Sequence, residues 1–89
     1  MKYFAAILLM LDSERNKTLR PQHLAFLQEQ ESKGRIFARG PFSDGAGGLV
    51  IYQGESLEEA RSFAESDPYV AGGARRLELH PWEMAPRTV

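Results

Sequence analysis

The chain has 89 residues, enough for a single domain over residues 1–89, and it contains no cysteine. Disulfide staples, thiolate chemistry and zinc–sulfur sites are therefore excluded. Eleven Lys and Arg residues against twelve Asp and Glu residues give a net charge of -1. We expect neither nucleic acid nor an anionic membrane as the main partner, because either would favour a basic excess.

An apolar strand is expected first, at residues 3–10, where every residue is apolar. A strand points alternate side chains to opposite faces, so an unbroken apolar strand is covered on both and lies centrally in its sheet. The run is too short to cross a bilayer, and no small-residue cleavage site follows it. We therefore expect a cytoplasmic protein.

A polar loop at residues 12–18 and a helix over residues 20–33 are expected next. Pro21 suits the first turn of a helix, where its missing N–H costs nothing. Gly34 is a natural C-terminal stop, because glycine readily adopts the left-handed conformation that ends helices.

Two further strands are expected at residues 35–42 and 49–53, joined by a glycine-rich turn at residues 43–48. This turn lacks the Lys-Ser/Thr pair of a phosphate-binding loop. Its small residues leave little side-chain packing to hold it, so we expect it to be more mobile than the flanking strands.

A second helix is expected from a capping box formed by Ser56 and Glu59, and it runs to about residue 66. Asp67 ends this helix, because a residue before proline is pushed out of helical geometry. A fourth strand at residues 75–82 alternates leucine with polar residues, and residues 83–89 form a loose tail.

The resulting order is βαββαβ, which predicts an α+β, ferredoxin-like domain. Right-handed crossovers then give a four-stranded antiparallel sheet with both helices on one face. The other face would remain bare although the first strand is apolar on both sides. Pairing two such faces around a twofold axis would bury this surface, so the sequence predicts a homodimer.

A histidine and an aspartate are expected to meet at one edge of this sheet. His23 lies in the first turn of the predicted first helix and on its apolar side, and Asp67 follows the second helix on its inner side. A helix N-terminus disfavours a cationic histidine, which would keep His23 neutral and able to accept a proton. His80, at the far end of the fourth strand, is expected at the opposite edge.

Structural roles also account for several of these residues. A histidine on an apolar face is most often a core residue, and Asp67 before Pro68 can cap a short turn without losing a second role. Arg75 and Arg76 are interpreted as a solvated pair. His80 has no partner at metal-ligand spacing, and no Ser/His/Asp nucleophile arrangement occurs. The chemistry that remains is proton transfer, without a metal or cofactor.

The sequence resembles the YciI-like family over nearly its whole length. The similarity rests on the apolar first strand and on short motifs: Arg20-Pro21-Gln22-His23-Leu24, Gly34-Arg35, Gly40-Pro41, Ser56-Leu57-Glu58-Glu59-Ala60 and Asp67-Pro68-Tyr69-Val70 with Ala71-Gly72. The resemblance implies a dimeric α/β-barrel fold, related to muconolactone isomerase and small antibiotic-biosynthesis monooxygenases. It also implies an active site at His23 and Asp67. One family member is a dehydrochlorinase of a chlorinated hydroxyquinol.

The leading functional prediction is a cofactor-independent enzyme for proton transfer or elimination on a small aromatic or enolisable molecule. His23 would be the general base, Asp67 its orienting partner and Tyr69 a hydrogen-bond donor. Arg39 would contact an anion, with Gly40 and Pro41 beside it in the substrate site. The alternative is a non-catalytic small-molecule binding module that uses the same pocket. An RNA-binding domain is disfavoured, because residues 49–53 supply one aromatic residue and no charge.

Overall fold

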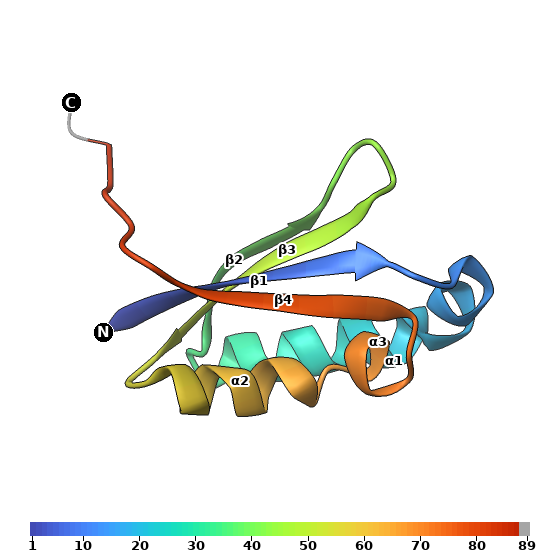
Figure 1. Cartoon of the computed structure of the whole chain (residues 1–89). Coiled ribbons are helices and arrows are strands. Elements are labelled where there is room, and N and C mark those ends of the chain that lie inside the picture. The colour runs from blue at the N-terminus through green and yellow to red at the C-terminus, as the bar shows by residue number, and fades with distance from the viewer. Residues whose placement is uncertain (88–89) are drawn as a thin grey trace.

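The computed structural model describes residues 1–87 (Figure 1). Its elements are β1 (Lys2–Met10), α1 (Ser13–Ser32), β2 (Ile36–Pro41), β3 (Gly47–Gly54), α2 (Leu57–Glu65), α3 (Pro68–Ala71) and β4 (Arg75–Trp82). Residues 83–87 of the expected tail have no regular structure and lead away from the sheet (Figure 1). The last two residues of that expected tail lie outside the described part of the chain.

The four strands form one antiparallel sheet in the order β2-β3-β1-β4, so β1 is central as predicted. Figure 1 shows that, within residues 1–87, the helices lie on one side of this sheet and none lies on the other. The order and the layering confirm the predicted ferredoxin-like fold. The short helix α3 occupies the turn expected after Asp67.

The core lies between the sheet and the helices. Alternate residues of β1 point into it, and these are Phe4, Ala6 and Leu8, which pack against Val50 and Tyr52 of β3. Leu27 of α1 and two alanines of α2 close the cluster from the helical side. The intervening residues of β1 point to the other face, because side chains alternate along a strand. None of the described helices has the length and apolar character needed to cross a membrane.

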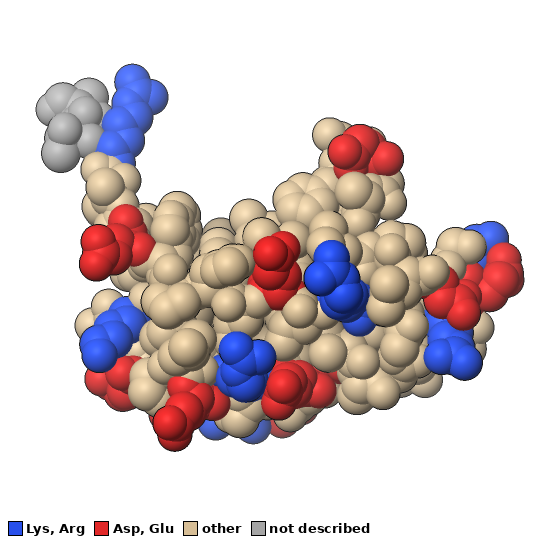
Figure 2. Space-filling view, viewed as in Figure 1, with Lys and Arg blue, Asp and Glu red and all other residues tan. Residues whose placement is uncertain are grey.

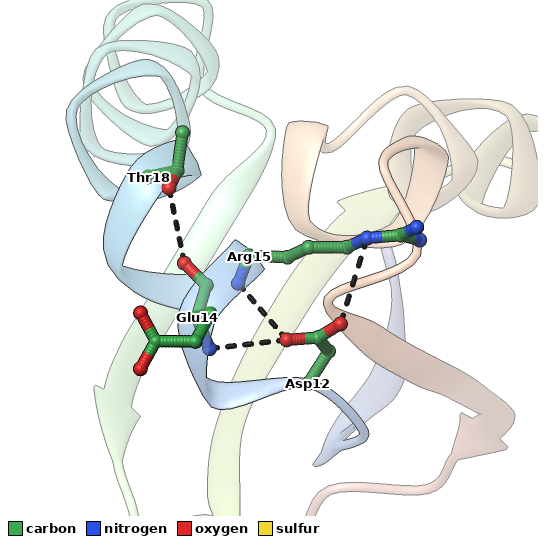
Figure 3. Close-up of polar contacts among 4 residues, drawn as sticks. All are labelled: Asp12, Glu14, Arg15 and Thr18. Carbon is green, nitrogen blue, oxygen red and sulfur yellow. Dashed lines mark hydrogen bonds and ion pairs between the residues drawn. The ribbon is translucent and has the colours of Figure 1, made fainter.

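The beginning of α1 differs from the prediction. Residues 13–19 are helical, and Asp12 is the N-cap: its Oδ1 accepts from the N–H groups of Glu14 at 3.0 Å and Arg15 at 3.1 Å (Figure 3). The expected polar loop at residues 12–18 is therefore wrong, and Pro21 lies inside the helix. These first turns carry almost no apolar stripe, and capping with local polar contacts stabilises them instead.

The second helix begins as predicted, with one difference in its cap. The Ser56 hydroxyl accepts from the Glu59 N–H at 3.1 Å. The Glu59 carboxylate reaches back to the N–H of Glu55 at 3.2 Å, one residue before the expected partner. Both contacts satisfy donors at the helix start, so the capping box retains its function.

Two glycines that were expected in the turn belong to β3. Gly47 and Gly48 pair with Leu9 and Leu8 of β1. Gly47 has φ +135°, and a Cβ atom there would overlap the carbonyl oxygen of Leu8. The absence of a side chain therefore allows the two backbones to approach closely at this point.

The connection between β2 and β3 thus comprises residues 42–46, and we predict fast amide hydrogen exchange in its turn. The turn is held by few backbone contacts, such as the bond from the Gly45 N–H to the Phe42 carbonyl at 3.2 Å. Exposed turns with little packing open at low free-energy cost. Exchange measured by NMR should be much faster at Ser43 than at Ala6 in the buried centre of β1. Comparable protection at the two sites would contradict the prediction.

Charged side chains of both signs are interspersed on the face shown in Figure 2, without a large area of one sign. This distribution matches the nearly balanced composition.

Candidate functional site

The structure brings His23 and Asp67 into direct contact. His23 Nδ1 lies 2.7 Å from Asp67 Oδ1, and the two residues are 7% and 0% exposed. A carboxylate can only accept hydrogen bonds, so Nδ1 carries the proton and Nε2 is the nitrogen left for other partners. Because α1 begins at Ser13, His23 lies in the middle of this helix. The predicted influence of a helix N-terminus on His23 is therefore wrong.

Asp67 also caps α3, as the structural interpretation predicted. Its Oδ1 accepts from the Tyr69 N–H at 2.9 Å, and Pro68 is the first helical residue. The same oxygen thus serves the backbone of α3 and the imidazole of His23. Asp67 Oδ2 is buried and has no hydrogen-bond partner among the described residues. The carboxylate is fixed on one side and has unused acceptor capacity on the other.

Tyr69 holds the imidazole from its flat side. The rings of His23 and Tyr69 are stacked with centroids 3.8 Å apart and an interplanar angle of 18°. The Tyr69 hydroxyl is buried and has no hydrogen-bond partner among the described residues. Burial, and secondarily the charge of Asp67, raises the pKa of Tyr52, which remains a neutral phenol at physiological pH.

A cavity of about 120 Å³ lies against this group of residues. It is lined from several elements, by His23 of α1, Tyr69 of α3, the end of β2 with Arg39, Gly40 and Pro41, Gly48 of β3 and Arg75 of β4. The cavity thus lies at the edge of the sheet where the predicted topology placed His23 and Asp67. The volume is comparable with engineered cavities of about 150 Å³ that bind benzene.

The predicted anion contact Arg39 is already paired in this structure. Its Nε and Nη2 donate to the carboxylate of Glu31 at 3.1 and 3.2 Å. His80 is exposed and lies 3.5 Å from Glu78, so it takes no part in the cavity.

Arg75 is a cavity residue that the sequence analysis missed. The prediction that Arg75 and Arg76 are both solvated is wrong for Arg75. Arg76 is exposed, whereas Arg75 is 9% exposed and lines the cavity. The signal was available in the strand pattern, since Arg75 has the same parity as Leu77 and Leu79, which pack on the core. Arg20 lines the cavity as well.

The fold and the buried pair define a small α+β protein of ferredoxin-like topology, with a cavity lined by both polar and apolar side chains between the sheet and the helices. The YCII-related domain matches residues 1–83, and the chain belongs to this family.

Individual relatives agree with this assignment. Protein YciI of Escherichia coli is 41% identical over 70 residues, which cover 67% of this chain and 71% of that protein. The uncharacterized protein YjpA of Bacillus subtilis is 37% identical over 62 residues, covering 70% of this chain and 73% of that protein.

One solved structure shares the fold, with a TM-score of 0.76, 24% identity and 96% coverage of both chains. It is the 5-chloro-2-hydroxyhydroquinone dehydrochlorinase TftG of Burkholderia phenoliruptrix in complex with 2,5-dihydroxybenzoquinone.

Proposed function

We propose that this protein is a cofactor-independent enzyme that catalyses proton transfer or elimination on a small aromatic or enolisable molecule. The observation that carries the proposal is the 2.7 Å contact between His23 Nδ1 and Asp67 Oδ1 at the wall of a small cavity. A histidine oriented by a buried carboxylate is a recurrent arrangement for a general base.

In the proposed step, His23 Nε2 takes a proton from the bound molecule. The imidazole then becomes cationic while Nδ1–H remains bonded to Asp67, whose negative charge offsets the new positive charge. The Tyr69 ring and the hydrogen bond to Asp67 fix the imidazole plane before the reaction. The buried Tyr69 hydroxyl is a candidate donor to the bound molecule.

The fold relative supports this class of reaction. Dehydrochlorination removes a proton and a chloride from one molecule, and this chemistry requires a base at the site. TftG is named for such an activity on a chlorinated hydroxyhydroquinone. The cavity of about 120 Å³ in the present chain accommodates a molecule of about one ring.

The experiment is a substrate panel of chlorinated hydroxyquinols and enolisable keto acids in D2O. NMR would follow deuterium incorporation, and a chloride assay would follow elimination. Turnover by the wild-type protein that disappears in His23→Gln supports the proposal, since glutamine keeps hydrogen bonding but cannot take the proton. Ligand-induced stabilisation without conversion of any panel member would instead identify a non-catalytic binding module.

We also propose that two copies of this chain pair through the open face of the sheet. Side chains that point away from the helices on β1, β2 and β3 are mostly apolar, and include Ala5, Ile7, Leu9, Leu49, Ile51 and Phe37. Phe37 is 52% exposed although it contacts Tyr3 with ring centroids 5.2 Å apart. An apolar sheet face of this kind is typical of a buried interface.

Sedimentation equilibrium at micromolar concentration is expected to give about twice the chain mass of 10.0 kDa. Ile7→Asp should shift the mass toward the monomer, because a charge would be buried in the interface. Ser62→Asp, on the exposed side of α2, is the matched control and should leave the dimer intact. A wild-type chain that sediments as a folded monomer would refute the pairing.

A further inference from the structure

The cavity has an excess of positive charge. Three arginines line it, namely Arg20, Arg39 and Arg75, whereas no Asp or Glu is among its described lining residues. Glu31 neutralises Arg39 through a two-fold contact. No ion pair with a carboxylate of residues 1–87 neutralises Arg75. A cation at 9% exposure therefore lies at the cavity with no carboxylate of the described residues in ion-pair contact.

Neutral groups hold the Arg75 guanidinium in place. Its Nε donates to Asn16 Oδ1 at 2.9 Å, and its central carbon lies 4.2 Å from the centroid of the Tyr69 ring. Within the described chain, no protein acceptor bonds to its two terminal nitrogens. The amide and the ring orient the guanidinium, so its terminal N–H groups remain available to a ligand.

The strand opposite the guanidinium lacks a side chain at the point of contact. A Cβ atom on Gly48 would lie 3.1 Å from Arg75 Nη1 and 3.0 Å from the carbonyl oxygen of Gly40. Glycine at this position therefore leaves room for the terminal nitrogen against β3. The space beside the guanidinium therefore results from the absence of a side chain on β3.

The electrostatic setting of Arg75 is unfavourable in the empty protein. Burial lowers its pKa, interactions with Tyr69 and Asp67 oppose this effect, and the like charge of Arg20 adds to it. Arginine nevertheless remains protonated in proteins. The buried charge without an ion-pair partner therefore raises the free energy of the empty protein. An anion that enters the cavity would remove this cost.

We propose that the cavity binds a small organic carboxylate through Arg75, with the carboxylate oxygens on its terminal nitrogens. A planar carboxylate matches the two parallel N–H groups of a guanidinium, and a single ring fits the available volume. The remainder of the molecule would then lie toward His23 and Tyr69. The inference rests on the proposed function only in treating this carboxylate as part of a substrate, because its binding requires no reaction.

Benzoate and benzamide are the probes, since they share shape and differ in charge. Isothermal titration of the wild-type protein should show benzoate binding about tenfold or more tighter than benzamide. Arg75→Gln should abolish this preference through a loss of benzoate affinity, with benzamide affinity little changed. Arg76→Gln, one residue along the strand and exposed, is the matched control and should retain the preference.

Equal affinity of the wild-type protein for both probes, or no binding of either, would overturn the proposal. A preference that persists in Arg75→Gln would also overturn it, and would assign Arg75 a structural role. Should Arg75→Gln fail to fold, Arg75→Lys keeps the charge but not the planar fork, and a reduced preference in it supports the proposal. The two proposals can fail separately. If His23→Ala still prefers benzoate, and the wild-type protein converts no member of the substrate panel, the anion site is supported and the proposed reaction is refuted.

Discussion

Replacement of His23 by alanine is expected to lower turnover of the substrate found in the panel by about 10²–10⁴-fold, the usual contribution of a general base. In the proposed reaction, the imidazole bonded to Asp67 takes the proton. Steady-state kinetics with the wild type and the variant measure the loss, and circular dichroism checks the fold. Because His23 is 7% exposed, some loss of thermal stability should accompany the substitution.

Asp67→Asn separates the two roles of that side chain. Asparagine caps helices about as well as aspartate, so α3 should persist. It carries no charge to offset a cationic imidazole, so turnover should fall while the position of His23 is retained. His80→Ala should leave turnover unchanged, because His80 is exposed and away from the cavity.

A different pattern would exclude the acid–base mechanism. If His23→Ala and Asp67→Asn lost thermal stability to the same large extent, with no specific effect on turnover, the pair would be purely structural. Undiminished turnover in His23→Gln would have the same meaning, since glutamine cannot act as the base.

Gly47→Ala is expected to reduce the free energy of unfolding by about 3 kcal/mol or more. The glycine has φ +135°, a conformation that residues with a Cβ rarely adopt, and the added carbon would overlap the Leu8 carbonyl in the paired strand. The strands would have to separate at the end of β3 nearest the cavity. Urea denaturation followed by circular dichroism measures the change.

Gly45→Ala is the matched control for this prediction. Gly45 has φ +82° but open space around the added carbon, so only the backbone conformation is penalised, by about 1–2 kcal/mol. Equal stability losses in the two variants would show that the close approach of β1 and β3 has no energetic importance.

The topology and the position of the His23–Asp67 pair could be predicted from the sequence because both depend on simple periodic signals. The apolar run of β1, the glycine-rich turn and the capping box at Ser56 define the order of elements. Once that order is known, right-handed crossovers bring His23 and Asp67 to one edge, although they are separated by 44 positions. The catalytic role of the pair stays a prediction.

The start of α1 and the environment of Arg75 could not be predicted in the same way. The first turns of α1 are polar on all sides, and Pro21 resembles a helix start, so the local pattern favours the wrong boundary. Arg75 is positioned by Asn16 from those same turns, 59 positions away in the chain. Strand parity could have indicated that Arg75 points toward the core, but its contact with Asn16 leaves no periodic signal and depends on residues that the sequence analysis placed in a loop.

The double use of Asp67 Oδ1 has a consequence for how proteins of this shape can diverge. The oxygen that caps α3 is also the one that binds His23. Folding and the proposed chemistry both use this side chain, but they require different properties of it. Folding accepts any good capping residue, whereas an acid–base reaction needs the negative charge. A single substitution of aspartate by asparagine would therefore leave the architecture and the cavity in place and remove the negative charge beside His23. Under the proposed function, a lineage would pass from catalyst to ligand carrier in a single step, without an unstable intermediate.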